Sequence, residues 1–237
     1  MSRKVALIAG VGPGTGASLA RAFAGEDHAV ALLSRHADSS RPVAEQIRAQ
    51  GGTAVAMPTD VTDRQSVNGT VAKIHAELGP VTVLACNASG YGRGSFLELD
   101  PSQISWAFDV GVMGAVHLAQ AVIPDMLQAG YGFISLTGAT AALRGRAGFA
   151  PLAIAKSSLR MLGQSLAREF HPKGIHVLHV IVDGQIDTPR LRLRDPDRAI
   201  ETVIQPDAIA AAVLNAFRQP RNAWTQEIDI RPAVEVF

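Results

Sequence analysis

A glycine-rich turn near the start of the chain has the composition of a phosphate-binding site. It lies between an apolar run and a segment of helical period, and it contains Gly10, Gly12, Gly14, Thr15 and Gly16. Glycines let a ligand approach the backbone because no Cβ atom stands in the way. The amides at a helix N-terminus attract an anion. We therefore expect this turn to bind the diphosphate of a dinucleotide, and the open alternative is an ordinary tight turn between a strand and a helix.

The second apolar run ends in Ser34 and Arg35, at the distance from the glycines where NAD-binding proteins usually present an acidic residue. An acid would repel a 2′-phosphate, whereas a guanidinium attracts it and binds it through two hydrogen bonds. The sequence therefore favours NADP(H) over NAD(H) as the cofactor. The alternative is that Arg35 is a solvated arginine at a strand end.

Composition limits what kind of protein can carry these residues. The chain has 237 residues, of which 47% are hydrophobic and 18% are charged, and its net charge is +1. We expect one compact domain over 1–237, no membrane span, and no nucleic-acid partner, because bulk positive charge is lacking. Cys86 is the only cysteine, so an internal disulfide is impossible and a cytoplasmic location is favoured. His117, His176 and His179 lack metal-ligand spacing, and no metal site is predicted.

Apolar runs and helical segments alternate along the whole chain. The predicted strands cover 4–9, 29–33, 53–57, 81–86, 132–137, 176–182 and 227–230. The predicted helices cover 16–25, 41–50, 63–78, 101–129, 150–170 and 206–217. This alternation predicts the α/β class, with a doubly wound parallel sheet of about seven strands and helices on both faces. The irregular segment 187–205 is expected to be a mobile substrate flap, or else a solvated loop.

Taken together, these features resemble the classical short-chain dehydrogenase/reductase family over nearly the whole chain. Gly10, Gly14 and Gly16 match the G-x3-G-x-G loop of that family, although Pro13 lacks an amide hydrogen and removes one possible phosphate donor. The resemblance implies a Rossmann-like fold. It also implies an NADP(H)-dependent oxidoreductase that acts on a small organic substrate.

Further matches to the family concern cofactor contacts. Asp60 and Val61 resemble the pair that contacts the adenine, and Asn87 and Ala88 resemble the segment that lines the cofactor cleft. Thr188 matches the threonine that contacts the nicotinamide carboxamide or the diphosphate. For Asp60, Val61, Asn87 and Ala88, the alternative is that they only supply turn chemistry.

The resemblance breaks at the residues that move the proton. In the family a tyrosine donates the proton, and a lysine four residues later lowers its pKa and holds the ribose. A serine orients the substrate carbonyl, and an asparagine anchors a water relay. Lys156 matches the lysine, but Leu152, Ala139 and Gly111 stand in the other three positions. None of these three side chains can exchange a proton.

Three explanations of this loss stay open. In the first, another group supplies the proton. Tyr91, just after the Asn87 segment, is the candidate acid, beside a Lys156 that is catalytic and binds the ribose. Asp183 and a shifted Thr137 or Thr140 are weaker candidates for the acid. The substrate can be an iminium, or can take its proton from water; carbonyls, imines and activated alkenes are therefore all considered. The protein can also bind NADP(H) without turnover, as a redox sensor or partner subunit. We favour the oxidoreductase because the hydride-transfer elements are retained.

Two long predicted helices suggest an oligomer. The segments 101–129 and 150–170 are rich in Ala, Leu, Val and Gly, and they offer more apolar surface than one sheet face needs. We expect a homodimer or homotetramer through these helices, with the tail 224–237 in a second contact. The alternative is that both helices are simply buried.

Overall fold

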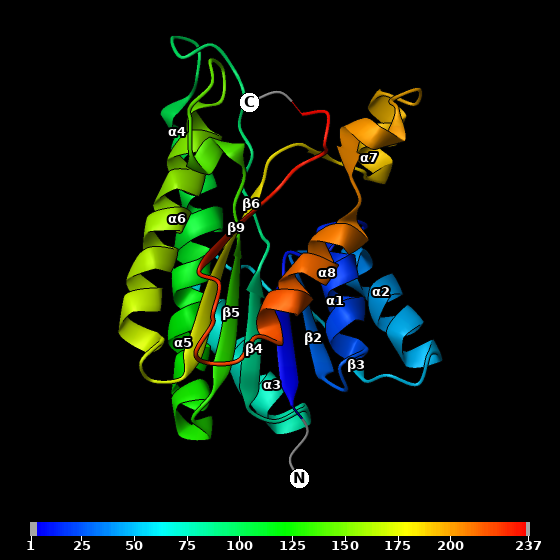
Figure 1. Ribbon diagram of the computed structural model, residues 1–237, viewed down its shortest axis with the longest axis vertical. Helices are drawn as coiled ribbons and strands as arrows, with labels where there is room; N and C mark the ends of the chain where they lie inside the picture. The colour runs from blue at the N-terminus through cyan, green and yellow to red at the C-terminus, as the bar shows by residue number, and fades with distance from the viewer. Residues whose placement is uncertain (1–3, 236–237) are drawn as a thin grey trace.

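The computed structural model describes residues 4–235, and its centre is a seven-stranded parallel sheet (Figure 1). The strand order is β3-β2-β1-β4-β5-β6-β9. The strands are β1 (Val5–Ala9), β2 (Ala29–Ser34), β3 (Ala54–Pro58), β4 (Val81–Cys86), β5 (Gly132–Thr137), β6 (Ile175–Val182) and β9 (Glu227–Ile230). A separate parallel pair joins β7 (Gln185–Ile186) to β8 (Val203–Ile204). The predicted fold class is confirmed.

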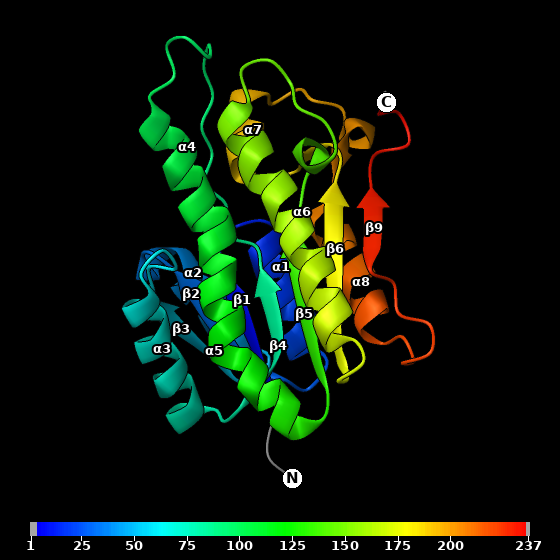
Figure 2. The same ribbon diagram turned by 90° about the vertical axis from the view of Figure 1, so that its left-hand side faces the viewer.

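Helices cover both faces of the sheet, and the two layers are seen in Figures 1 and 2. One layer holds α1 (Thr15–Ala24), α2 (Ala37–Ala49) and α8 (Pro206–Phe217). The other holds α3 (Arg64–Glu77), α4 (Pro101–Phe108), α5 (Gly114–Ala129) and α6 (Ala150–Phe170). Because side chains alternate along β1, Leu7 packs in the core of one layer and Ile8 in the core of the other. Burial on both faces explains why the strands are continuous apolar runs.

Two helices differ from the sequence-based expectation. The segment predicted as one helix over 101–129 contains a π-helical stretch, η1 (Asp109–Met113), between α4 and α5. Helix α2 begins at Ala37 instead of 41, because the hydroxyl of Ser34 donates to Ser40 at 2.8 Å and fixes the first turn. By length and composition, Pro101–Ala129 could cross a membrane, but 56% of its most apolar stretch is buried inside the protein, as in a core helix.

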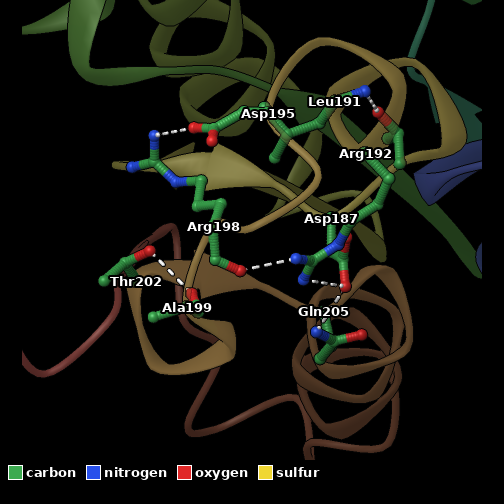
Figure 3. A network of polar contacts seen from close by, with 9 residues as sticks. Asp187, Leu191, Arg192, Asp195, Arg198, Ala199, Thr202 and Gln205 are labelled. Atoms are coloured by element: carbon green, nitrogen blue, oxygen red, sulfur yellow. Dashed lines mark hydrogen bonds and ion pairs between the residues drawn. The ribbon is translucent and has the colours of Figure 1, made fainter.

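The segment 187–205 is more regular than expected. It contains α7 (Pro189–Arg194), a short 3-10 helix η3 (Ile200–Thr202) and the strand β8. Figure 3 shows the polar network that joins them: Arg192 donates two hydrogen bonds to the carboxylate of Asp187, at 2.6 and 2.9 Å. Arg192 also donates to the carbonyl oxygen of Arg198 at 2.6 Å, and Gln205 donates to Asp187 at 2.9 Å. The segment thus consists of short elements whose charged residues pair with one another, and whether it moves as a flap stays a prediction.

The substrate role of this segment stays a prediction. So does the second contact through the tail 224–237, whose last two residues lie outside the described part of the chain.

Candidate functional site

The glycine-rich turn is compact because two of its glycines admit no side chain. Gly10 has a φ of +88°, and a Cβ atom there would lie 2.4 Å from the backbone nitrogen of Ala88. A Cβ atom on Gly16 would lie 2.4 Å from the carbonyl oxygen of Gly10. Gly12 is different, since no atom of the residues that the structure describes lies within 4 Å of its Cβ position. Space is therefore left above Gly12, where a ligand can approach the backbone.

Donors for an anion gather where this turn enters α1. The amides of Thr15 and Gly16 open the helix, so they have no intrahelical acceptor. The hydroxyl oxygen of Thr15 is buried and has no hydrogen-bond partner among the described residues. A buried hydroxyl without a partner is costly, and an anionic ligand relieves this cost. The turn and the helix N-terminus together fit a phosphate group.

Two clefts meet above the turn. The first has a volume of about 360 Å³ and extends toward the ends of β2 and β3. The second has a volume of about 460 Å³ and extends toward α6 and α7. They share Gly10, Gly12, Asn87 and Ser89, so they form one continuous groove along the carboxyl edge of the sheet. Asn87 fixes the middle of this groove, because its side chain donates to the carbonyl oxygen of Gly10 at 2.9 Å. A switch point of this kind is where open α/β sheets bind ligands.

Every cofactor-binding residue expected from the sequence lines this groove. The first cleft is lined by Ser34, Arg35, Asp60, Val61 and Ala88, in addition to the shared residues. The second is lined by Gly14, Thr15, Gly16, Lys156 and Thr188. The structure thus brings together residues from five loops that are far apart in the sequence.

Arg35 is the cationic side chain at the outer end of the first cleft. It is exposed, and its guanidinium carbon lies 5.9 Å from the centre of the Trp106 ring on α4. Asp60 accepts hydrogen bonds from the hydroxyl and the amide of Thr62, at 2.7 and 2.9 Å. These bonds lower the pKa of Asp60, and the charge of Arg35 lowers it further. Ser34 is less available than expected, because its hydroxyl already contacts the carbonyl oxygen of His36 at 2.7 Å and Ser40.

Several residues of the first cleft were not anticipated. His36 and Ser39 lie beside Arg35, and their position directly after the second strand is a signal that could have identified them. Trp106 and Val110 come from the α4–η1 helix, on the other layer of the molecule. No local pattern in the sequence marks these two residues, because only the packing of distant elements places them beside Arg35.

Lys156 is buried in the second cleft. Its side chain is on α6, the residue is 5% exposed, and its Nζ donates to the carbonyl oxygen of Thr137 at 2.6 Å. Burial lowers the pKa of Lys156 to about 8. The nearby thiol of Cys86 is also buried, which raises its pKa to about 12. Cys86 is therefore an uncharged neighbour, and burial moves the pKa of Lys156 toward the neutral range.

Among the other expected proton carriers, Thr137 lines the second cleft, whereas Tyr91, Thr140 and Asp183 line neither cleft. Tyr91 is 50% exposed, packs edge-to-face on Phe149 with ring centres 6.3 Å apart, and lines neither cleft. Thr140 donates its hydroxyl hydrogen to the carboxylate of Asp183, and that carboxylate also lies 3.4 Å from Arg231. Thr140 and Asp183 are thus engaged with each other, beside Ala139 rather than in its place.

Thr188 lines the second cleft, whereas Gly111 lines neither cleft. Thr188 accepts a hydrogen bond from the amide of Leu191 at 3.2 Å and caps α7, so its hydroxyl hydrogen stays free to donate. Gly111 lies in η1, where its Cβ position is 3.7 Å from the Cβ atom of Ala155, the neighbour of Lys156. The π-helical stretch therefore packs directly against the part of α6 that carries Lys156.

Comparisons with known proteins agree with this geometry. The family model described as "short chain dehydrogenase" matches residues 4–199. A solved structure of a short-chain dehydrogenase from Rhodopseudomonas palustris is 32% identical, with 97% of this chain and 98% of that chain covered and a TM-score of 0.81.

Two curated relatives are reductases by name. The ketoacyl reductase HetN of Nostoc sp. is 26% identical, over 92% of this chain and 76% of its own length. The glycine betaine reductase ATRR of Emericella nidulans is 30% identical over 99% of this chain, which spans 19% of that protein's length. The match of the family model over most of the chain, with this glycine turn and this buried lysine, makes the protein a member of the short chain dehydrogenase family of oxidoreductases.

Proposed function

We propose that the protein is an NADP(H)-dependent oxidoreductase that acts on a small organic substrate, namely a carbonyl, an imine or an activated alkene. The observation that carries this proposal is the continuous groove from Arg35 to Lys156 across the glycine turn. Proteins of similar fold have been solved with related cofactors. A metagenomic short-chain oxidoreductase was solved with NADP, and an alcohol dehydrogenase from Thermococcus sibiricus with 5-hydroxy-NADP. Both are 24% identical to this chain, with TM-scores of 0.83 and 0.88, and they support the fold rather than the cofactor.

The residues of the groove fit a dinucleotide from end to end. Arg35 offers a guanidinium for the 2′-phosphate, and Asp60 and Val61 flank the adenosine end. The amides and the unpartnered hydroxyl of Thr15 fit the diphosphate. Lys156 and Asn87 fit the nicotinamide ribose, and Thr188 fits the carboxamide. When bound there, the nicotinamide supplies the hydride.

The proton has to come from a group other than a tyrosine at position 152. Lys156 holds a proton at Nζ with a pKa of about 8, which lies closer to neutral pH than that of a solvated lysine. One of its three hydrogens is donated to Thr137, so two remain for the cleft. We propose Lys156 as the catalytic acid as well as a ribose-binding residue. Tyr91 stays the second candidate for the catalytic acid, because its loop would have to change conformation before its hydroxyl could reach the cleft.

A turnover experiment tests this function. The purified protein is mixed with NADPH and a panel of carbonyls, imines and activated alkenes, and oxidation of NADPH is followed by absorbance. We expect turnover with at least one class, and Lys156→Met should lower the rate by about 10²-fold or more, the usual contribution of a positioned acid. Arg168→Ala, a surface change on α6, serves as the matched control. No oxidation with any class of substrate would contradict the proposal.

A second candidate function is NADP(H) binding without turnover, as a redox sensor or partner subunit. The apolar Leu152 and Ala139, where the family has a proton donor and a serine, favour it. The double variant Leu152→Tyr, Ala139→Ser separates the two functions. If the wild-type protein is inactive and the variant reduces carbonyls, the groove is competent and the wild-type protein is a binder. The sensor also predicts a change of oligomeric state between the NADP⁺ and NADPH forms, seen by sedimentation.

A further inference from the structure

Arg190 differs from the other arginines of the 187–205 segment, because no other described residue bonds to its side chain. Arg192 binds Asp187, and Arg198 lies 3.5 Å from Asp195; both pairs are drawn in Figure 3. Arg194 donates to the side chain of Gln185 at 3.3 Å. Within residues 4–235, Arg190 has neither a hydrogen bond nor an ion pair. The other three arginines of the segment thus each have a partner, whereas the guanidinium of Arg190 is available to a ligand.

The position of Arg190 is defined by the contact between α7 and the glycine turn. A Cβ atom on Gly14 would lie 3.1 Å from Cγ2 of Thr188, so the start of α7 packs directly against the turn. Arg190 lies two residues further along, and it lines the second cleft together with Pro13 and Gly14. It therefore belongs to the wall of the cleft that faces the N-terminus of α1.

The glycine turn itself offers fewer donors than its length suggests. Pro13 has no amide hydrogen, and the amide of Gly14 donates to the carbonyl oxygen of Gly12 at 2.8 Å. Two successive positions are therefore lost to an anion. The cations among the described residues that line the second cleft are Lys156 and Arg190. Lys156 is bonded to Thr137, beneath the end of β5, which leaves Arg190 as the cation beside the turn.

We propose that Arg190 binds the diphosphate of the dinucleotide from the α7 side and supplies the charge that the turn at Pro13 and Gly14 does not. This inference rests on the proposed function, because it concerns the same groove. The Asp187–Arg192 pair fixes the backbone that carries Arg190. Only the side chain has to be ordered when the ligand binds, which limits the entropic cost of binding.

Calorimetry with three ligands tests the assignment. NADP⁺ carries both the diphosphate and the 2′-phosphate, ADP-ribose carries only the diphosphate, and adenosine 2′-monophosphate carries only the 2′-phosphate. For Arg190→Gln we expect NADP⁺ and ADP-ribose to bind about tenfold more weakly, as for the loss of one charge-assisted bond, with adenosine 2′-monophosphate unchanged. For Arg35→Gln we expect the opposite pattern: NADP⁺ and adenosine 2′-monophosphate weaken, and ADP-ribose is unchanged.

Arg194→Gln is the matched control, since it removes the same charge from the same short helix at a position outside both clefts. It should change none of the three affinities by more than about twofold, apart from general screening effects. Arg190→Gln should unfold at the wild-type temperature, because Arg190 is exposed and has no partner to lose among residues 4–235.

Two outcomes would overturn the inference alone. In the first, the wild-type protein binds NADP⁺, and Arg190→Gln binds NADP⁺ and ADP-ribose as tightly as the wild-type protein does. In the second, Arg190→Gln loses as much affinity for adenosine 2′-monophosphate as it does for NADP⁺ and ADP-ribose. If the wild-type protein binds none of the three ligands, the proposed function fails and the inference fails with it.

Discussion

Lys156 combines two properties that conflict in most proteins, a side chain that is charged in water and a position that is 5% exposed. Within the described part of the chain, its ammonium has one acceptor, the carbonyl oxygen of Thr137, and an uncharged thiol lies nearby. In the family pattern a phenol would stand one helical turn away, at the position of Leu152. Here the apolar Leu152 offers no hydrogen bond. The low pKa of Lys156 follows from its burial.

The burial of Lys156 predicts a pH-dependent stability. The pKa is about 8 in the folded protein and 10.5 when the side chain is solvated, so between these values the unfolded chain binds the extra proton. The free energy of unfolding of the wild-type protein therefore contains a term that rises with pH across this window, by up to about 3 kcal/mol. Lys156→Met lacks this term, because methionine does not titrate.

Urea denaturation of both proteins at pH 7 and pH 10 measures the effect. The stability of Lys156→Met relative to wild type should be greatest at pH 7, where the buried ammonium is a cost to the native state, and should fall by pH 10. A difference that is the same at both pH values would show that the ammonium is not desolvated.

At the scale of elements, the groove depends on how closely neighbouring segments approach. Strand β9 closes the sheet beside β6, and its Glu227 accepts two hydrogen bonds of 2.7 Å from Arg160 on α6. Glu227 also lies 2.9 Å from the Nδ1 atom of the buried His179 on β6. His179 in turn packs under Gly138, where a Cβ atom would lie 2.4 Å from its Nε2. The loop of Gly138 and Ala139, which lines the second cleft, thus packs against His179, and Glu227 and Arg160 hold His179 in place.

Two glycines allow a matched test of these close approaches. A Cβ atom on Gly16 would lie 2.4 Å from a backbone oxygen, whereas a Cβ atom on Gly111 would make an ordinary contact of 3.7 Å with Ala155. We expect Gly16→Ala to lower the free energy of unfolding by about 1–3 kcal/mol through overpacking. Gly111→Ala should raise it by about 0.5–1 kcal/mol, because alanine restricts the unfolded chain.

Chemical denaturation of the two variants beside the wild-type protein checks this pair. A destabilised Gly111→Ala variant would mean that the π-helical stretch requires glycine. A Gly16→Ala variant as stable as wild type would mean that the turn can open.

The strands and most helices could be predicted because each is coded locally. A strand buried on both faces reads as a continuous apolar run, and a turn between strand and helix contains glycines. The early start of α2 could not be predicted, since it depends on the contact of Ser34 with Ser40. The π-helical stretch at 109–113 carries no pattern that distinguishes it from the helices on either side. The position of Trp106 beside Arg35 and the pairing of Arg192 with Asp187 likewise depend on tertiary packing.

At the scale of the whole molecule, the outer faces of the long helices carry exposed apolar side chains. Ile154 is 41% exposed and Met161 50%, and their spacing of seven residues places them on one face of α6. Leu127 on α5 is 41% exposed. We propose that these faces meet in a homodimer or homotetramer, because isologous helix pairs bury such surfaces.

Sedimentation velocity tests the assembly. The wild-type protein should sediment as a dimer or tetramer, and Met161→Glu should dissociate it, since a charge would be buried between like copies. Met161→Leu, which keeps the surface apolar, should leave the assembly unchanged. A monomeric wild-type protein would contradict the proposal.

In the proposed complex, the groove binds a phosphorylated pyridine nucleotide, and Arg35 binds its 2′-phosphate. Calorimetric titration of the wild-type protein with NADPH and with NADH tests this claim most directly. We expect NADPH to bind at least about tenfold more tightly than NADH, a difference of about 1.4 kcal/mol, and Arg35→Ala to remove that preference. The absence of binding heat for both nucleotides, or an equal affinity for the two in the wild-type protein, would contradict it.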